Sequence, residues 1–202
     1  MSLPAALPPI SSFVLSPERA EDAPAIEALL DRAFGADRRS KRSYSYRQGC
    51  ASLPELRLTA RDGDGRLVGT IRYWPLVVRQ GRRRRPALLL GPLAVEPSLA
   101  GRGIGRALVR ESLDRARAAG HALVLLVGDV AYYGQFGFEP AAPRGFVMPG
   151  ESPARLQALA LAPGALAGGG TLEAVLGVRK PPMPGAGRSR TRAPATSAAA
   201  GL

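Results

Sequence analysis

The sequence has 202 residues, of which 46% are apolar, and this is enough for one sizeable hydrophobic core. Its apolar runs are far shorter than the ~20 residues that a membrane span requires. Its start lacks the charged segment of a secretory signal, and the single cysteine, Cys50, excludes an internal disulfide. We therefore expect one cytoplasmic domain over residues 13–178, between disordered segments at 1–12 and 179–202, and no membrane partner.

The net charge of +12 raises the question of a nucleic-acid partner. Residues 179–202 hold five basic and no acidic residues, so 12 − 5 leaves +7 on the rest of the chain. Four more arginines form one run, Arg82 to Arg85, which we interpret as a solvated hairpin tip. No basic helix with interleaved aromatic residues and no DNA- or RNA-binding motif accompanies this charge. The absence of such features argues against a nucleic-acid partner, and attraction of an anionic cofactor is enough to explain the positive charge.

The first half of the chain predicts a strand, a helix and an antiparallel meander. The strand covers 13–15, and the helix covers 23–34 with its apolar residues on one side. Alternating residues predict a strand at 56–61, and the turn at 62–65 leads into a long strand at 67–78, where Pro75 suggests a bulge or an interruption. The strand at 87–95 completes the meander.

A glycine-rich turn at the centre of the chain indicates an anion site. The apolar run that ends at Val95 is followed by Gly101-Arg102-Gly103-Ile104-Gly105, then by a helical pattern at 106–119 and a buried-type strand at 121–127. Glycines without β-carbons let an anion reach backbone N–H groups, and the helix dipole favours negative charge there.

Spacing separates the phosphate-binding families that use such a turn. A P-loop needs Lys-Ser/Thr after its last glycine, where Arg106-Ala107 stands instead. The dinucleotide pattern G-x-G-x-x-G does not fit, whether it is counted from Gly101 or from Gly103. The turn resembles the Q/R-x-x-G-x-G/A motif of the GCN5-related N-acetyltransferases (GNAT). One alignment sets Gly103 and Gly105 on the family glycines, with Ala100 where Gln or Arg is usual. Another starts at Arg102; we prefer the first, since it keeps both glycines at the helix entrance.

A second motif strengthens the resemblance. The segment 128–138, GDVAYYGQFGF, resembles the family's Tyr-x-x-x-Gly-Phe motif, and the form G-D-x-x-Y-Y-x-x-F-G-F resembles a branch of predicted bacterial acetyltransferases. The resemblance covers roughly residues 13–163, with specific motifs in 88–138. It implies an α+β fold in α/β/α layers: a mixed, mostly antiparallel sheet of about six or seven strands flanked by helices.

The resemblance also implies a coenzyme site. Leu93, Ala94 and Val95 would pair with the pantetheine arm of acetyl-CoA as a pseudo-strand. The pyrophosphate would lie on the turn and the first helical residues: Ala100, Gly101, Arg102, Gly103, Ile104, Gly105, Arg106 and Ala107. Arg102 and Arg106 could add charge-assisted contacts to phosphate oxygens.

Tyr133 stands at the family position of the tyrosine that protonates the coenzyme A thiolate. A phenol with a pKa near ~10 suits that task. We expect its neighbour Tyr132 to pack in the core. Glu96 and Asp129, each at a strand end, are the candidate bases, although either could be a cap or a surface charge. No cluster has metal-ligand spacing, so no metal is expected.

The reading that follows is an acetyl-CoA-dependent N-acetyltransferase that acts on a primary amine by direct attack. The acceptor, a small molecule or a protein amine, is not readable, but by resemblance the stretch Lys41 to Arg47 could touch it. An ordinary solvated segment explains that stretch equally well. The alternative is a non-catalytic acyl-CoA-binding or regulatory module, which stays open because Ala100 stands where the family motif has Gln or Arg. A homodimer is open as well.

Overall fold

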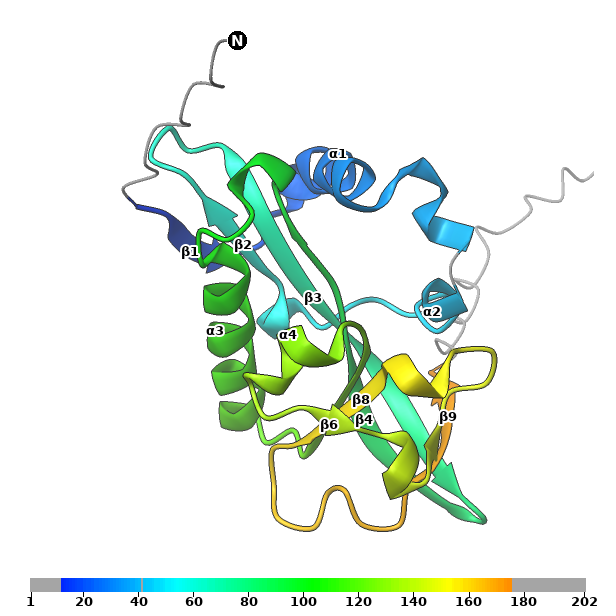
Figure 1. Ribbon diagram of the computed structural model, residues 1–202. Coiled ribbons are helices and arrows are strands. Elements are labelled where there is room, and N and C mark those ends of the chain that lie inside the picture. Colours follow the sequence, from blue (N-terminus) through cyan, green and yellow to red (C-terminus); the bar gives the residue numbers. More distant parts are fainter. Residues whose placement is uncertain (1–11, 41, 176–202) are drawn as a thin grey trace, which may run out of the picture.

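The computed structural model describes residues 12–40 and 42–175 (Figure 1). The predicted disordered segments therefore lie outside the described residues, apart from residue 12. Four α-helices occur in the described part: α1 (Ala23–Phe34), α2 (Arg42–Ser45), α3 (Ile104–Ala118) and α4 (Val130–Gly134). The strands are β1 (Val14–Pro17), β2 (Leu58–Arg61), β3 (Leu67–Gln80), β4 (Arg83–Val95), β5 (Leu123–Val127), β6 (Glu139–Pro140), β7 (Phe146–Val147), β8 (Leu156–Ala160) and β9 (Gly170–Ala174).

These strands form one mixed, mostly antiparallel sheet, which confirms the predicted fold class. Its order is β1-β2-β3-β4-β5-β8-β6, and β9 pairs with β3 and β7. The pairs β4–β5 and β7–β9 are parallel, and the others are antiparallel. The described sheet has nine strands rather than six or seven, and two of them, β6 and β7, are only two residues long.

Helices cover the two faces of the sheet. The apolar side of α3 packs on one face through Leu108, Val109, Leu113 and Ala116. The apolar side of α1 packs with Ala94, whose neighbours Leu93 and Val95 belong to the cluster under α3. Because successive residues of a strand point to opposite faces, α1 and α3 lie on opposite faces of β4. Figure 1 shows these two helices on separate sides of the long β3–β4 ribbon.

A bulge interrupts the β3–β4 ladder, but not at Pro75. Tyr73 pairs with Leu90 and Ile71 pairs with Leu93, so Arg72 lies opposite both Gly91 and Pro92. The expectation of an irregularity at Pro75 is therefore wrong.

Pro75 pairs in register with Leu88. It is tolerated because it falls in the gap along β3 between the β2 pairing, which ends at Ile71, and the β9 pairing, which begins at Leu76. No neighbouring strand needs a donor from this position.

Past the bulge, β4 and β5 separate. Their parallel pairing is confined to Leu88 with Val124 and Leu89 with Leu125. From Leu90 to Val95, β4 is therefore bonded to a neighbouring strand on its β3 side only. The opening between the two strands is the feature around which the site is built.

The arginine run lies at the exposed end of the β3–β4 hairpin, as expected, except for Arg85. Gly81 and Arg82 form the turn between β3 and β4, and Arg84 pairs with Glu173 at 3.1 Å. Arg85 donates hydrogen bonds to the carbonyl oxygens of Ala165 and Gly169, at 2.6 and 3.2 Å. Arg85 therefore departs from the solvated interpretation, because it is half-buried and bonded to the segment before β9, whereas Arg82, Arg83 and Arg84 are exposed.

Candidate active site

Two cavities lie beside the opening between β4 and β5. One, here called the glycine cavity, has a volume of about 510 Å³ and is lined by residues 99–106 with Val95, Tyr132 and Gln135. The other, here called the arginine cavity, has a volume of about 550 Å³. It is lined by Arg38, Arg42, Arg47 and Arg155, by Tyr133 and Asp129, and by residues 90–93 of β4.

The glycine cavity contains the N-terminus of α3. Gly103 is the N-cap residue, with a left-handed φ of 84°, and no side chain caps the first turn. A left-handed φ costs a glycine little, so the chain can turn sharply from β4 into the helix. The uncapped N–H groups and the dipole of a 15-residue helix favour a bound anion here.

Gly105 is small because Tyr132 approaches it. A β-carbon at Gly105 would lie 2.6 Å from Oη of Tyr132 and 3.5 Å from a methyl group of Val95. The phenol of Tyr132 therefore forms one wall of the glycine cavity. The expectation that Tyr132 packs in the core is wrong: the residue is only half-buried, and burial raises the pKa of its hydroxyl.

Most of the residues that we expected to bind coenzyme line the glycine cavity. These are Val95, Ala100, Gly101, Arg102, Gly103, Ile104, Gly105 and Arg106. Leu93 lines the arginine cavity instead, and Ala94 is buried against α1. The N–H of Ala107 donates to the carbonyl oxygen of Gly103 at 3.0 Å, so the helix itself occupies that donor.

Residues 128–138 place Tyr133 at the end of β5. The backbone N–H of Tyr132 donates to a carboxylate oxygen of Asp129 at 2.7 Å, which caps the short helix α4. A β-carbon at Gly128 would lie 2.4 Å from the Tyr133 ring, so only glycine lets this ring pass the backbone. The glycine and the aspartate of the motif therefore both serve to position Tyr133.

The Tyr133 ring is held by aromatic neighbours. It makes edge contacts with Tyr132 and Phe138, at centroid distances of 4.9 and 5.7 Å, and packs against the core cluster under α3. Burial raises the pKa of the Tyr133 hydroxyl well above its ordinary value; Tyr132 raises it further, while Arg47 lowers it. The phenol is therefore protonated at neutral pH and faces the arginine cavity.

The two candidate bases have different surroundings. Asp129 lines the arginine cavity together with Tyr133. Glu96 follows β4, forms an ion pair with Arg32 at 2.9 Å, and lines neither of the two cavities. Of the two candidate bases, Asp129 is therefore the one that shares a cavity with the phenol.

Part of the polar stretch after α1 lines the arginine cavity, and its contact with an acceptor stays a prediction. Arg42, Ser43, Tyr44 and Arg47 line it, whereas Lys41 lies outside the described residues. Sequence reasoning missed Arg38, which lines the same cavity and is 2% exposed. It also gave no special role to Gly91 and Pro92, although a proline within an apolar strand pattern signals a bulge.

Residues 12–40 and 42–175 contain neither a metal-binding cluster nor a membrane-spanning helix. There, no group of three or more His, Cys, Asp or Glu side chains could hold a metal ion. No helix of this part is both long and apolar enough to cross a membrane.

Comparison with known proteins identifies relatives of the chain. The family model of the acetyltransferase (GNAT) domain matches residues 16–141. A protein of Escherichia coli K12 named "Uncharacterized N-acetyltransferase YhbS" is 39% identical over 121 residues, which are 60% of this chain and 70% of that protein. A second protein of that strain, "Uncharacterized N-acetyltransferase YjhQ", is 34% identical over 122 residues, or 60% and 66% of the two chains.

Two solved structures resemble the fold over most of its length. The crystal structure of YhbS from Escherichia coli in complex with CoA has a TM-score of 0.69 and 34% identity, and the match covers 81% of this chain and 89% of that one. A GNAT family acetyltransferase from Brucella melitensis, in complex with acetyl-CoA, has a TM-score of 0.58 and 29% identity, with 75% and 90% covered.

Proposed function

This chain belongs to the acetyltransferase (GNAT) family, and we propose that it transfers an acetyl group from acetyl-CoA to a primary amine. The observation that carries the proposal is the pair of cavities on either side of α4. One is walled by an uncapped helix N-terminus, and the other contains a protonated tyrosine. The CoA and acetyl-CoA complexes of the two similar structures support the choice of donor.

In this proposal the glycine cavity binds the coenzyme. Its pyrophosphate accepts hydrogen bonds from the first-turn N–H groups of α3, and Arg102 and Arg106 lie at the same cavity to neutralise charge. The pantetheine arm lies along β4 from Val95 towards Leu93, on the side that β5 leaves unpaired. The thioester then reaches the bulge at Gly91, where the arginine cavity begins.

The reaction needs one proton donor and one proton acceptor. The neutral amine attacks the thioester carbonyl carbon, a tetrahedral intermediate forms, and the C–S bond breaks as the carbonyl re-forms. Tyr133 protonates the departing thiolate, and because burial raises its pKa the phenol is in the protonated form at neutral pH.

The nitrogen loses its proton to Asp129, directly or through water. Asp129 is preferred to Glu96 because it lines the cavity that contains Tyr133, whereas Glu96 is paired with Arg32. One of its oxygens caps α4, and the other is left for this task.

The test is binding followed by turnover. At a CoA concentration of 100 times the dissociation constant, the folded state should gain about 2.7 kcal/mol, seen as a raised melting temperature. NAD and ATP should stabilise the protein markedly less. Thiol release from acetyl-CoA should then require an amine from a library of small amines and peptides. Equal stabilisation by NAD would contradict the proposal, and CoA binding without turnover on any amine would favour a non-catalytic acyl-CoA-binding module.

A further inference from the structure

Arg47 is half-buried, and its guanidinium is incompletely paired. Its Nε and Nη1 atoms are buried, and neither has a hydrogen-bond partner among the described residues. Its guanidinium carbon lies 4.4 Å from the centroid of the Tyr44 ring, a cation–π contact. Burial lowers the pKa of Arg47 to about 10, against an opposing effect of Tyr44, so the group stays charged at neutral pH. A buried charge is costly unless it is paired and hydrogen-bonded.

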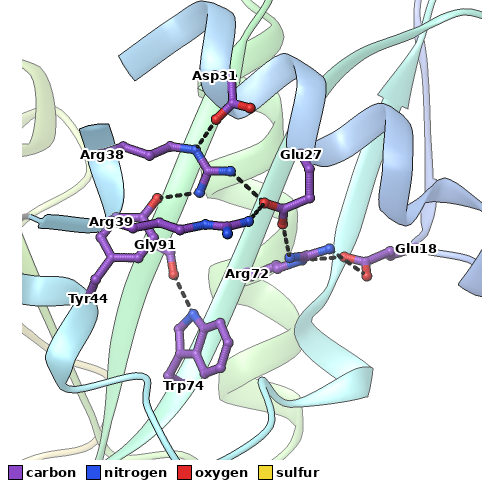
Figure 2. A network of polar contacts seen from close by, with 9 residues as sticks. All are labelled: Glu18, Glu27, Asp31, Arg38, Arg39, Tyr44, Arg72, Trp74 and Gly91. Atoms are coloured by element: carbon purple, nitrogen blue, oxygen red, sulfur yellow. Dashed lines mark hydrogen bonds and ion pairs between the residues drawn. The ribbon is translucent and has the colours of Figure 1, made fainter. Parts of the chain in front are cut away.

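The acidic groups of α1 beside Tyr44, Glu27 and Asp31, are engaged by other arginines. Figure 2 shows that Arg38 donates hydrogen bonds to Glu27, to Asp31 at 2.8 Å and to the Tyr44 hydroxyl at 3.2 Å. Glu27 also accepts a hydrogen bond from Arg39 at 2.8 Å. This network anchors Arg38 and the Tyr44 ring to α1, and the guanidinium of Arg47 lies over the face of that ring.

The same holds on the β3 side of the network. Glu18 accepts two hydrogen bonds from Arg72, at 2.7 and 2.9 Å, and the carbonyl oxygen of Gly91 accepts one from Trp74 Nε1 at 2.7 Å (Figure 2). Neither acceptor group bonds to Arg47. Neither the α1 side nor the β3 side of the network therefore supplies a hydrogen-bond partner for Nε and Nη1 of Arg47.

Arg47 also lies where the reaction would occur. Its Nη2 atom is 3.0 Å from the position that a β-carbon on Gly91 would take, so the glycine at the bulge leaves room for the guanidinium. Gly91, Arg47 and Tyr133 line one cavity. A ligand group that paired with Arg47 would therefore be held beside the point where β4 and β5 separate.

We propose that the acceptor is a small amine that bears a free carboxylate, and that Arg47 binds this carboxylate. A guanidinium matches a carboxylate with two parallel N–H···O hydrogen bonds, which supplies the missing partners of Nε and a terminal nitrogen. This proposal rests on the proposed acetyl transfer, because it assigns the acceptor of that reaction.

The arginine cavity also contains groups of the opposite sign. Asp129 and Glu151 line it, and neither forms an ion pair within the described ranges. They can receive the ammonium group of an acceptor whose carboxylate lies on Arg47. A zwitterion such as an amino acid therefore matches the cavity better than a simple alkylamine.

The experiment compares matched acceptors. Thiol release from acetyl-CoA is measured with a panel of L-amino acids and with the carboxamide of each, which keeps the amine and removes the anion. We expect the best acid to exceed its carboxamide in kcat/KM by about 10–100-fold, the range for hydrogen bonds to charged groups. Arg47→Gln should lower the value for the acid to that of the carboxamide and leave CoA affinity unchanged. Arg110→Gln, on the exposed side of α3, is the control for loss of a positive charge.

Three results would overturn the proposal. One is equal use of acids and carboxamides by the wild-type protein. Another is an Arg47→Gln variant that loses kcat equally on both, which would place the guanidinium on the thiolate or oxyanion. The third is a fall of several degrees in the melting temperature of ligand-free Arg47→Met, because a residue kept for a ligand should cost stability rather than supply it.

A separate binding readout keeps this test apart from the test of acetyl transfer. Failure of the proposed function would appear as no CoA binding, or as CoA binding without turnover on any amine. If CoA binds but no acceptor turns over, N-acetylated amino acids and their carboxamides are compared by thermal shift in the presence of CoA. A larger shift with the acids, lost in Arg47→Gln, supports the carboxylate site, and equal or absent shifts contradict it.

Discussion

The glycine cavity and the arginine cavity are of similar size but are built in different ways. The first is formed largely by one contiguous stretch, 99–106, whose backbone turns into α3. The second takes side chains from segments as distant in sequence as Phe34 and Arg155. A site made of backbone N–H groups suits an anionic ligand such as a pyrophosphate, whatever the side chains around it. A site made of side chains can change its ligand by substitution, so we assign the coenzyme to the first and the acceptor to the second.

The largest expected effect comes from Tyr133, which lines the arginine cavity and packs against Tyr132 in the wall of the glycine cavity. Tyr133→Phe removes one hydroxyl and little volume, so the fold and CoA affinity should survive. General acid catalysis contributes on the order of 10²–10⁴-fold, and kcat should fall by that factor. Steady-state kinetics on the best acceptor provide the measurement, and a wild-type kcat would show that another group or water protonates the thiolate.

Gly128→Ala should displace the Tyr133 ring. Its β-carbon would lie 2.4 Å from the Tyr133 ring, and a displacement of about 1 Å can cost on the order of 10²-fold in rate. Gly134→Ala is the matched control on α4, because a β-carbon there meets nothing within 4 Å. The kcat of the first variant should drop by at least ~10-fold and that of the second should stay near wild type. Equal rates for the two variants would mean that the position of Tyr133 is unimportant.

A smaller effect is expected at the wall of the glycine cavity. Tyr132→Phe removes the hydroxyl beside Gly105, and one neutral hydrogen bond is worth about 0.5–1.5 kcal/mol. Calorimetry should therefore show CoA affinity reduced by no more than about 10-fold, with kcat nearly unchanged. A kcat loss as large as that of Tyr133→Phe would show that the roles of the two tyrosines have been exchanged.

The smallest expected effect concerns the dependence of kcat on pH. A general acid works while it is protonated, and burial raises the pKa of Tyr133 above its ordinary value of about 10. The raised value extends the active range upward, so kcat should show no alkaline decline due to Tyr133 below pH ~10. A pH–rate profile that fell to the Tyr133→Phe level near pH 8–9 would contradict this assignment.

The difference between the cavities also explains what the sequence could predict. The helix 23–34, the strand β2 and the helix after Gly103 follow from periodicity, turns and caps, which are local signals. The glycine turn could be recognised because its function depends on neighbouring residues. Tyr133 could be singled out because of its place in the motif resemblance, and its role stays a prediction.

The arginine cavity could not be predicted from the sequence, because the residues that form it are far apart along the chain. The burial of Arg38 and Arg47 depends on α1, β4 and the segment after β5, which no local pattern brings together. The bulge at Gly91 was not predicted, because Pro75 in β3 suggested an irregularity that the ladder does not have there. The position of Tyr132 was predicted wrongly, because residue type alone does not determine burial.

The division of labour between the two cavities can be tested by titrating CoA into three proteins. Wild type should bind CoA, and Arg47→Gln should bind it with the same affinity. Gly105→Glu should lose at least ~100-fold in affinity while it remains folded, because the added carboxylate occupies and repels the pyrophosphate site at the helix N-terminus. Unchanged affinity in a folded Gly105→Glu variant, or a comparable loss in Arg47→Gln, would show that the coenzyme does not bind where we place it.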